Sequence, residues 1–263
     1  MMQDTLTHPI AFVGAGPGDP DLITVKGRKL LENADLVVFA GSLVPKALVH
    51  GLQAETVSSA GMNLEQIIEL MADRWRQGKK IVRLHTGDPS LYGAIKEQMM
   101  KLRELGIDHT VIPGVSSAFA AAAALQAELT LPEVSQTVII CRRAGRTPVP
   151  EKENLRSLAV HQASMLIFLS VGMISEVVDD LLAGGYPPST PVAVVEKASR
   201  PEEKTVRAAL CEIAAETQRE NISKTAIIAV GEVFRESDPE HLSRLYDKNF
   251  SHGCRNASKD GKQ

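Results

Sequence analysis

The chain has 263 residues, 44% of them hydrophobic, and a formal net charge of −3 from 29 basic and 32 acidic side chains. This length suits one large or two modest domains with ordinary cores, and the charge gives no general electrostatic reason to bind nucleic acid or an anionic membrane. Three widely spaced cysteines argue against a disulfide framework or a zinc site and favour a cytoplasmic protein, and no segment has the apolar run of a signal peptide or a membrane span.

Short runs rich in valine and isoleucine alternate with segments of helical period along the chain, which is typical of an α/β protein. Apolar residues at three- and four-residue steps predict amphipathic helices over 64–75 and 91–105. Strands are predicted at 10–14, 35–41, 81–87, 109–114, 137–142, 164–170, 191–198 and 224–231.

The alanine-rich stretch SSAFAAAAALQAEL, residues 116–129, interrupts this alternation and is followed by Pro132. Alanine favours a tightly packed helix here, and we expect the domain junction near residue 130. The sequence therefore predicts an N-terminal α/β domain at 1–130 and a C-terminal α/β domain at 131–240. Residues 241–263 are polar with nothing to bury, so we expect a mobile tail there.

The first predicted strand runs into a glycine-rich stretch, VGAGPGDPD, at residues 13–21. A dinucleotide-binding fingerprint needs a third glycine where Asp19 stands, and a carboxylate there would repel phosphate. Pro17 removes a backbone N–H donor from the same loop, and no Gly-Lys-Ser or Gly-Lys-Thr follows as in a P-loop. The stretch therefore predicts a sharp turn beside a close neighbour, not a nucleotide site.

Two later strands also end in unusual loops, HTGDPSLYG at 85–93 and PGVSS at 113–117. Ligands bind beyond the carboxyl ends of strands in open α/β sheets, so we expect the three loops to converge on one site. Gly-Asp-Pro occurs twice, with Asp19 and Asp88, and each of these aspartates has a structural alternative as a helix N-cap.

The stretches GAGPGDPDLITVKG, GDPSLYG, PGVSS and VVEKASRPEEKTV, in this order, resemble the tetrapyrrole (corrin/porphyrin) methyltransferases, the S-adenosyl-L-methionine-dependent family of vitamin B12 and siroheme synthesis. The resemblance covers residues 8–235. Two further stretches, FAGSLVP and CRRAGRTPVPEKENL, are similar to members that methylate C11 of precorrin-4 or cobalt-precorrin-4. The resemblance implies two α/β domains with the methyl donor in the cleft between them, and a homodimer.

Family positions carry over to this sequence residue by residue. The resemblance implies that the methyl donor contacts Gly87, Asp88, Leu91, Tyr92, Ser116, Ser117, Val171, Ala198, Thr225 and Ala226. Relatives often carry Met or Leu where Val171 stands, so its contact is expected through the backbone. The first glycine loop is expected to border the tetrapyrrole, through Gly16, Gly18 and Asp19. Any cobalt would be chelated by substrate nitrogens, so no protein-bound metal is expected.

A tetrapyrrole of this kind carries several carboxylates that need cationic partners. Arg142, Arg143 and Arg146 leave the fifth predicted strand together, and guanidinium forks suit carboxylates. The alternative is a solvated basic loop. His85 is either a core histidine or a hydrogen-bond donor to the substrate. No serine triad is recognisable and methyl transfer proceeds largely by proximity, so no residue is assigned as a nucleophile.

Three other functions stay open at this point. The first is another tetrapyrrole methyltransferase, acting at C17, at C20 or on uroporphyrinogen III. The second is a macromolecule methyltransferase of the same fold, such as diphthine synthase or a ribosomal RNA methyltransferase, against which the acidic balance counts. The third is a non-enzymatic nucleotide-binding module, which Asp19 and Pro17 disfavour.

Overall fold

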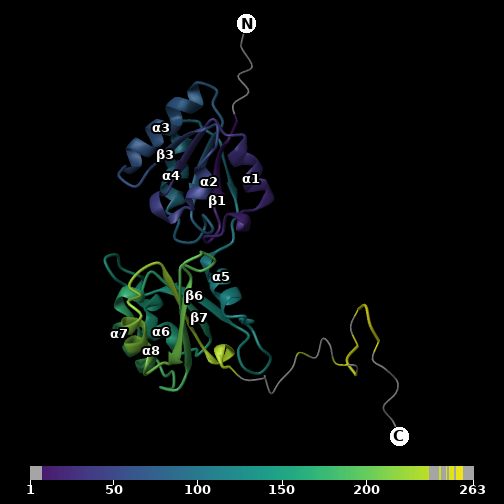
Figure 1. Ribbon diagram of the computed structural model, residues 1–263, viewed down its shortest axis with the longest axis vertical. Helices are drawn as coiled ribbons and strands as arrows, with labels where there is room; N and C mark the ends of the chain where they lie inside the picture. Colours follow the sequence, from purple (N-terminus) through teal and green to yellow (C-terminus); the bar gives the residue numbers. More distant parts are fainter. Residues whose placement is uncertain (1–7, 237–242, 244–246, 248, 252, 257–263) are drawn as a thin grey trace. The chain divides into compact units, whose positions relative to one another are not determined.

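The computed structural model describes residues 8–236, 243, 247, 249–251 and 253–256. Contacts divide the chain into two compact units (Figure 1). The first contains residues up to 120 together with 197–203, and the second contains 121–196 and residues from 204 onward. The division thus falls at 120/121, ten residues before the predicted junction, and a short segment of the second half belongs to the first unit. The predicted tail lies largely outside the described residues.

The first unit is built on a five-stranded parallel sheet in the order β3-β2-β4-β1-β5. Its strands are β1 (Ile10–Gly14), β2 (Leu36–Phe39), β3 (Glu55–Ser58), β4 (Ile81–His85) and β5 (His109–Ile112). Its helices are η1 (Pro20–Leu22), α1 (Val25–Glu32), η2 (Gly41–Leu43), α2 (Lys46–Val49), α3 (Leu64–Arg76) and α4 (Ile95–Glu104), and α5 (Ser117–Ala124) begins in it.

Helices cover both faces of this sheet, as a parallel sheet requires. Met71 of α3 and Leu102 of α4 pack with Phe12 on one face. Leu31 of α1 packs with Val13 on the other. The helices that follow β1 and β4 therefore lie on opposite faces although these two strands are neighbours. In open α/β sheets this change of direction marks the strand ends that bind ligands.

The second unit contains a mixed five-stranded sheet in the order β6-β7-β10-β8-β9, in which β6 and β7 are parallel and the other neighbours are antiparallel. Its strands are β6 (Val138–Arg142), β7 (Ser164–Phe168), β8 (Pro191–Glu196), β9 (Lys204–Ala209) and β10 (Ala226–Val230). Its helices are η3 (Glu151–Glu153), α6 (Leu155–Ala159), η4 (Val171–Met173), α7 (Ile174–Ala183), α8 (Ile213–Arg219) and η5 (Glu232–Phe234). Leu155, Leu181 and Ile213 bring α6, α7 and α8 onto one core with the strands.

The α/β class and the eight predicted strands are confirmed. Strand β1 has its predicted ends, and each of the other seven strands is shorter than predicted by one to three residues in total. The prediction missed β3 and β9, both sheet edges whose side chains are mostly exposed. The second predicted helix starts at Ile95 and not at residue 91, because the preceding residues form a tight loop. The alanine-rich stretch forms α5, which ends at Ala124.

Candidate functional site

The three glycine loops meet at the carboxyl ends of β4, β1 and β5, so the predicted convergence is confirmed. Gly16 and Gly87 exchange backbone hydrogen bonds, with N–O distances of 3.3 and 2.8 Å. A Cβ atom added to Gly14 would lie 2.6 Å from the Cα of Gly114, and one added to Gly114 would lie 2.2 Å from the carbonyl oxygen of Gly87. The loops therefore touch through their backbones, and positions 14 and 114 have no space for a Cβ atom.

The two Gly-Asp-Pro motifs have different roles. Asp88 accepts hydrogen bonds from the backbone N–H of Ser90 at 2.8 Å and of Gly114 at 2.9 Å, one on each carboxylate oxygen. It thus ties the loop after β4 to the loop after β5, and α4 begins only seven residues later. Asp19 is instead the N-cap of η1 and accepts from the N–H of Asp21 at 2.8 Å. The helix-cap alternative holds for Asp19 and fails for Asp88.

The loop at 87–94 has an unusual backbone. Gly87, Tyr92 and Ala94 have φ angles of 60°, 54° and 49°, a region that non-glycine residues seldom occupy. A Cβ atom on Gly93 would lie 2.1 Å from the carbonyl oxygen of Pro89. This tight loop leaves the side chain of Tyr92 44% exposed at the carboxyl end of the sheet.

The loop after β5 leads directly into α5. Ser116 is buried, and its hydroxyl oxygen accepts from the N–H of Ala118 at 3.3 Å. Its carbonyl oxygen accepts from Phe119 and Ala120, each at 3.1 Å. Ser117 is the first residue of α5. Both predicted serines thus lie beside the glycines of the site, at the point where the helix starts.

The segment 197–203 joins the same group of loops and contributes a residue that the sequence analysis missed. Its Ser199 hydroxyl accepts from the N–H of Asp19 at 3.0 Å. Arg200 donates from Nη2 to the carbonyl oxygen of Leu43 at 2.6 Å, and its Cγ would lie 2.3 Å from a Cβ on Gly18. Ala198 is buried beside them. Arg200 is part of the stretch VVEKASRPEEKTV, which carries the family resemblance. This stretch does not reveal that Arg200 contacts Gly18 and Leu43, which are far away in the sequence.

His85, the last residue of β4, lies in the interior. It is 4% exposed and its ring stacks on Phe12, with centroids 5.9 Å apart. Burial and the neighbouring charge of Arg83 lower its pKa to about 3, so the imidazole is neutral at physiological pH. This placement favours the core histidine, and a contact with the substrate stays a prediction.

In the second unit, the residues predicted for the site come together at one end of its sheet. Arg142 ends β6, Val171 follows β7, and Thr225 precedes β10. Because β10 runs antiparallel to β7, the start of one strand lies beside the end of the other. Ala226, the first residue of β10, pairs with Glu196 at the end of β8. Val171 and Ala226 are both buried.

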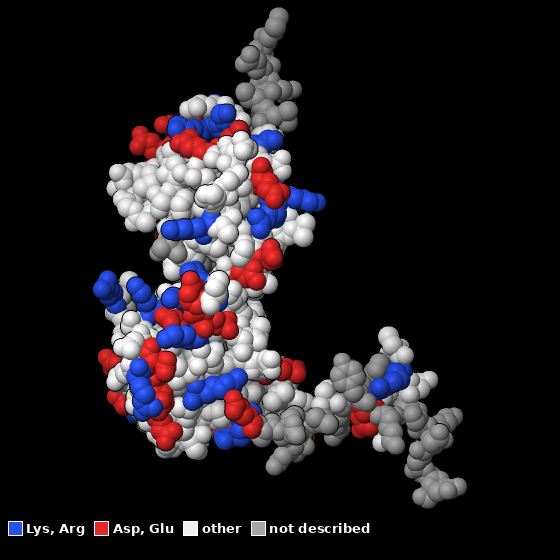
Figure 2. Space-filling model, in the orientation of Figure 1, with Lys and Arg blue, Asp and Glu red and all other residues white. Residues whose placement is uncertain are grey.

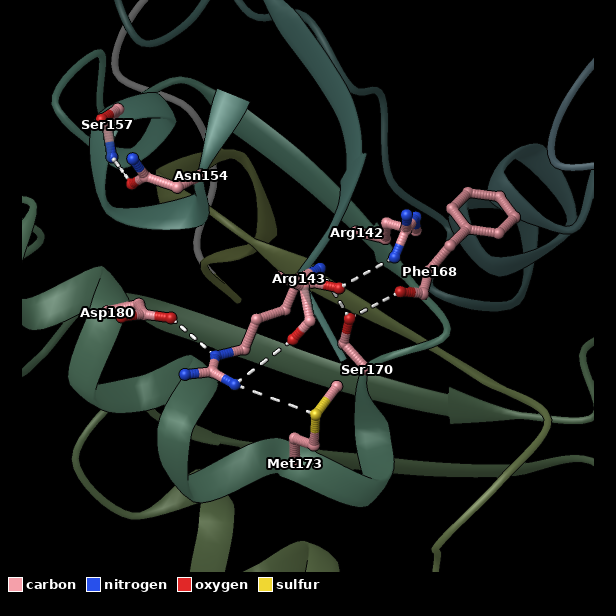
Figure 3. A network of polar contacts seen from close by, with 9 residues as sticks. Arg142, Arg143, Asn154, Ser157, Phe168, Ser170, Met173 and Asp180 are labelled. Atoms are coloured by element: carbon pink, nitrogen blue, oxygen red, sulfur yellow. Dashed lines mark hydrogen bonds and ion pairs between the residues drawn. The ribbon is translucent and has the colours of Figure 1, made fainter. Parts of the chain in front are cut away.

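The three arginines of CRRAGR have unequal surroundings, and Figure 3 shows two of them, Arg142 and Arg143. Arg142 donates from its guanidinium to the carbonyl oxygens of Thr147 at 3.2 Å and Pro148 at 2.6 Å, which closes the loop on itself. Arg143 forms an ion pair with Asp180 in α7, with Nε and Oδ2 2.7 Å apart. Arg146 is exposed, and within the described residues it has no recorded hydrogen bond or ion pair. Arg143 is thus the arginine whose charge is neutralised by a carboxylate, while in the described part of the chain the Arg142 guanidinium meets only neutral carbonyl oxygens and the Arg146 guanidinium is the most accessible to a ligand.

The end of β6 is also anchored to the segment that carries Val171. The N–H of Arg143 donates to the hydroxyl oxygen of Ser170 at 2.9 Å, and this hydroxyl donates to the carbonyl oxygen of Phe168 at 2.7 Å (Figure 3). Ser170 itself is fully buried. One serine therefore connects the arginine loop to the turn after β7.

A cavity of about 760 Å³ lies at the opposite, amino ends of the strands of the first sheet. Its lining includes Ala11, Val25, Lys26, Lys29, Lys80 and Val82. None of the residues predicted for the site lines it. We therefore place the candidate site at the converging loops and not at this cavity.

The surface charge, possible metal sites and possible membrane spans were compared with the sequence-based expectations. On the face shown in Figure 2, acidic and basic side chains are interspersed. Within the part of the chain that the structure describes, no three His, Cys, Asp or Glu residues gather as a metal site would require. No helix among these residues is both long and apolar enough to cross a lipid bilayer.

The chain is similar to proteins of known type over most of its length. The sequence model of the tetrapyrrole (corrin/porphyrin) methylases matches residues 9–214. A cobalt-precorrin-4 C(11)-methyltransferase of Methanocaldococcus jannaschii is 58% identical over 254 residues, which cover 95% of this chain and 97% of that protein.

Solved structures agree with the sequence comparison. The X-ray structure of a cobalt-precorrin-4 methyltransferase superimposes with a TM-score of 0.84 at 48% identity, covering 86% of this chain and 95% of the other. A uroporphyrin-III C-methyltransferase of Thermus thermophilus, crystallised with S-adenyl homocysteine, gives a TM-score of 0.74 at 29% identity, covering 87% of this chain and 94% of the other.

Proposed function

Because the chain belongs to the tetrapyrrole (corrin/porphyrin) methylase family, we propose that it is an S-adenosyl-L-methionine-dependent methyltransferase of cobalamin biosynthesis. Its reaction is methylation of C11 of precorrin-4 or cobalt-precorrin-4, which gives precorrin-5 or its cobalt form. The observation that carries this proposal is the 58% identity to a cobalt-precorrin-4 C(11)-methyltransferase over 95% of the chain.

The loops after β4 and β5 are suited to the methyl donor. Position 114 has no space for a larger residue without movement of the other loop, because a Cβ there would lie 2.2 Å from the carbonyl oxygen of Gly87. Gly87 has a φ angle of 60°, a conformation that favours glycine. We assign the donor contacts in this unit to Gly87, Asp88, Leu91, Tyr92, Ser116, Ser117 and Ala198. Those in the second unit are Val171, Thr225 and Ala226. One structural relative at 29% identity is a complex with S-adenyl homocysteine, which supports a donor of this chemistry.

The first glycine loop, with Gly16, Gly18 and Asp19, is assigned to the tetrapyrrole. We add Arg200 to this group, because its side chain packs on Gly18 and reaches the carbonyl oxygen of Leu43. Arg142, Arg143 and Arg146 are further candidates for the substrate carboxylates, as is His85 for a hydrogen bond. Of the three arginines, Arg146 has the most accessible charge and Arg143 the least, since Asp180 neutralises it.

The chemistry needs placement of two reactants more than it needs a reactive side chain. S-adenosyl-L-methionine supplies a sulfonium methyl group, and an electron-rich carbon of the macrocycle attacks it in line. Fixing the two reactants in this geometry is worth roughly 7–11 kcal/mol at best. The chain's own contribution is thus a rigid set of loops, held by Asp88 and the glycine contacts, that orients the donor and excludes water.

We also propose that the protein works in the cytoplasm as a homodimer, with the tetrapyrrole as its small-molecule partner and without nucleic acid or a membrane. The net charge of −3 supports the absence of an anionic polymer as partner. No metal bound by protein side chains is required, since cobalt would be held by the nitrogens of the macrocycle.

The test is incubation of the purified protein with S-adenosylmethionine carrying a labelled methyl group and with precorrin-4 or cobalt-precorrin-4 in turn. We expect one label per ring, at C11. Label at C17 or C20, or transfer only to uroporphyrinogen III, would assign the chain to another branch of the family. The rates with and without cobalt in the ring identify the natural substrate.

A further inference from the structure

A buried arginine lies below the loop at 87–94. Arg83, in the middle of β4, is 4% exposed, and within the described residues no acidic side chain forms an ion pair with it. Burial lowers its pKa to about 10, so the guanidinium is still charged at neutral pH. An unpaired buried charge is costly unless hydrogen bonds compensate it. The hydrogen bonds of Arg83 therefore indicate its role.

These bonds connect Arg83 to the loop through one glutamine. Arg83 donates from Nε to Oε1 of Gln98 at 3.0 Å and from Nη1 to the carbonyl oxygen of Val38 at 3.2 Å. Gln98, in α4 and 5% exposed, donates from Nε2 to the carbonyl oxygen of Ala94 at 3.0 Å. A guanidinium has only donors, so Arg83 fixes which end of the amide faces it and thereby turns the amide NH₂ toward Ala94.

Ala94 is the residue at which the loop becomes α4. It is the N-cap of that helix, has a left-handed backbone conformation and makes no side-chain capping bond. Tyr92, two residues earlier, is also left-handed. Such conformations persist at non-glycine residues only where the surroundings hold them. The hydrogen bond from Gln98 reaches the backbone at this point.

We propose that Arg83 and Gln98 are positioning residues, which hold the loop at 87–94 in the shape that binds the methyl donor. Neither residue touches the donor. They act on the α4 end of the loop, while Asp88 secures its other end to Gly114. The proposal rests on the proposed function, in which Asp88, Leu91 and Tyr92 contact S-adenosyl-L-methionine.

The decisive variant is Gln98→Glu. Glutamate has the same shape as glutamine, keeps an oxygen that accepts from Arg83, and makes that acceptor negatively charged. It has no N–H group to donate to the carbonyl oxygen of Ala94. We expect the melting temperature to be unchanged or raised, because the buried guanidinium gains a counter-charge. Calorimetry should nevertheless show at least fivefold weaker binding of S-adenosylhomocysteine. Amide hydrogen exchange at residues 88–94 should be faster than in the wild type.

In steady-state kinetics, the KM for S-adenosylmethionine should rise, with kcat at saturating donor and the KM for cobalt-precorrin-4 unchanged. Gln66→Glu is the matched control, because among the residues that the structure describes the Gln66 side chain acts as an acceptor alone, from the N–H of Asn63, and glutamate keeps this bond. Gln98→Met, which removes the amide but keeps the chain length, is measured in parallel so that the result does not depend on one variant.

Wild-type donor affinity and wild-type exchange in a folded Gln98 variant would overturn the proposal, and so would the failure of both variants to fold, since the role would then be structural only. If the wild-type protein itself did not bind S-adenosylhomocysteine, the proposed function would be wrong. The exchange data would then still show whether Gln98 holds the loop.

Discussion

The guanidinium of Arg143 is paired with the carboxylate of Asp180 at 2.7 Å, inside the second unit, while Arg146 three residues later is exposed. The three arginines that leave β6 therefore differ in the charge they offer to a ligand. Replacing Arg143 should act mainly on stability, because it breaks an ion pair between α7 and the arginine loop. Replacing its two neighbours should act mainly on the substrate.

Arg146→Ala and Arg142→Ala should each raise the KM for the tetrapyrrole about tenfold or more and leave the KM for S-adenosylmethionine unchanged. A charge-assisted contact shielded from water is worth roughly 1.5–3 kcal/mol. Arg156→Ala, at an exposed position of α6, is the control. Wild-type KM values in both variants at low ionic strength, where exposed charges act most strongly, would identify a merely solvated loop.

Asp88→Ala should weaken binding of S-adenosylhomocysteine by about tenfold or more, because the loop after β4 loses its hydrogen bonds to Ser90 and Gly114. Calorimetry measures the affinity and thermal unfolding the stability. Asp73→Ala, which removes an exposed ion pair with Arg76, is the matched control. A large fall in melting temperature with unchanged affinity would show that Asp88 serves the fold alone.

Gly114→Ala should prevent the loops from meeting, because the new Cβ would lie 2.2 Å from the carbonyl oxygen of Gly87. We expect the free energy of unfolding to fall by about 1–3 kcal/mol or more, which is the usual cost of an overpacked site. We also expect loss of donor binding. Gly61→Ala has no atom within 4 Å of the added Cβ and should leave both properties unchanged. Equal melting temperatures of the two variants would contradict the contact between the loops.

His85 should make the protein less stable in acid. Its folded pKa of about 3 lies below its ordinary value of 6.5, so between these pH values the unfolded state binds one proton more. The free energy of unfolding should therefore fall with decreasing pH below about 6.5, by up to about 1.4 kcal/mol per pH unit.

Urea unfolding from pH 7.5 to 5 measures this dependence. In His85→Gln the free energy of unfolding should depend less steeply on pH, by a slope that corresponds to nearly one proton. The same change at the exposed His161 should leave this slope as in the wild type. Identical slopes for wild type and His85→Gln would mean that the buried imidazole is not kept neutral.

The sequence predicted those parts of the fold whose signal is local. A strand buried in the middle of a sheet, such as β1 or β10, is a continuous apolar run, and each run was found. The edge strands β3 and β9 bury few side chains, so their sequences ETVS and KTVRAA carry no such run. The glycine-rich stretches that follow three of the predicted strands are also visible in the local sequence. The convergence of the three loops could therefore be predicted.

The parts that could not be predicted depend on partners far along the chain. Arg200 contacts Leu43, 157 residues away, and the sequence around neither residue indicates that the two are in contact. Arg83 was passed over because an arginine inside an apolar strand gives no sign of the glutamine that will accept its hydrogen bond. The hydrogen bond that Asp88 accepts from the N–H of Gly114, 26 residues later, likewise has no signal in the sequence around Asp88.

The placement of residues 197–203 in the first unit has a consequence for how the protein is made. The N–H of Asp19 finds its acceptor, Ser199, 180 residues further along the chain. During synthesis on the ribosome, the sheet β1–β5 can assemble early, but its first glycine loop has to wait until the second unit has largely been translated. A fragment that ends at residue 120 would therefore carry every strand of the first sheet and still lack the residues that complete this loop.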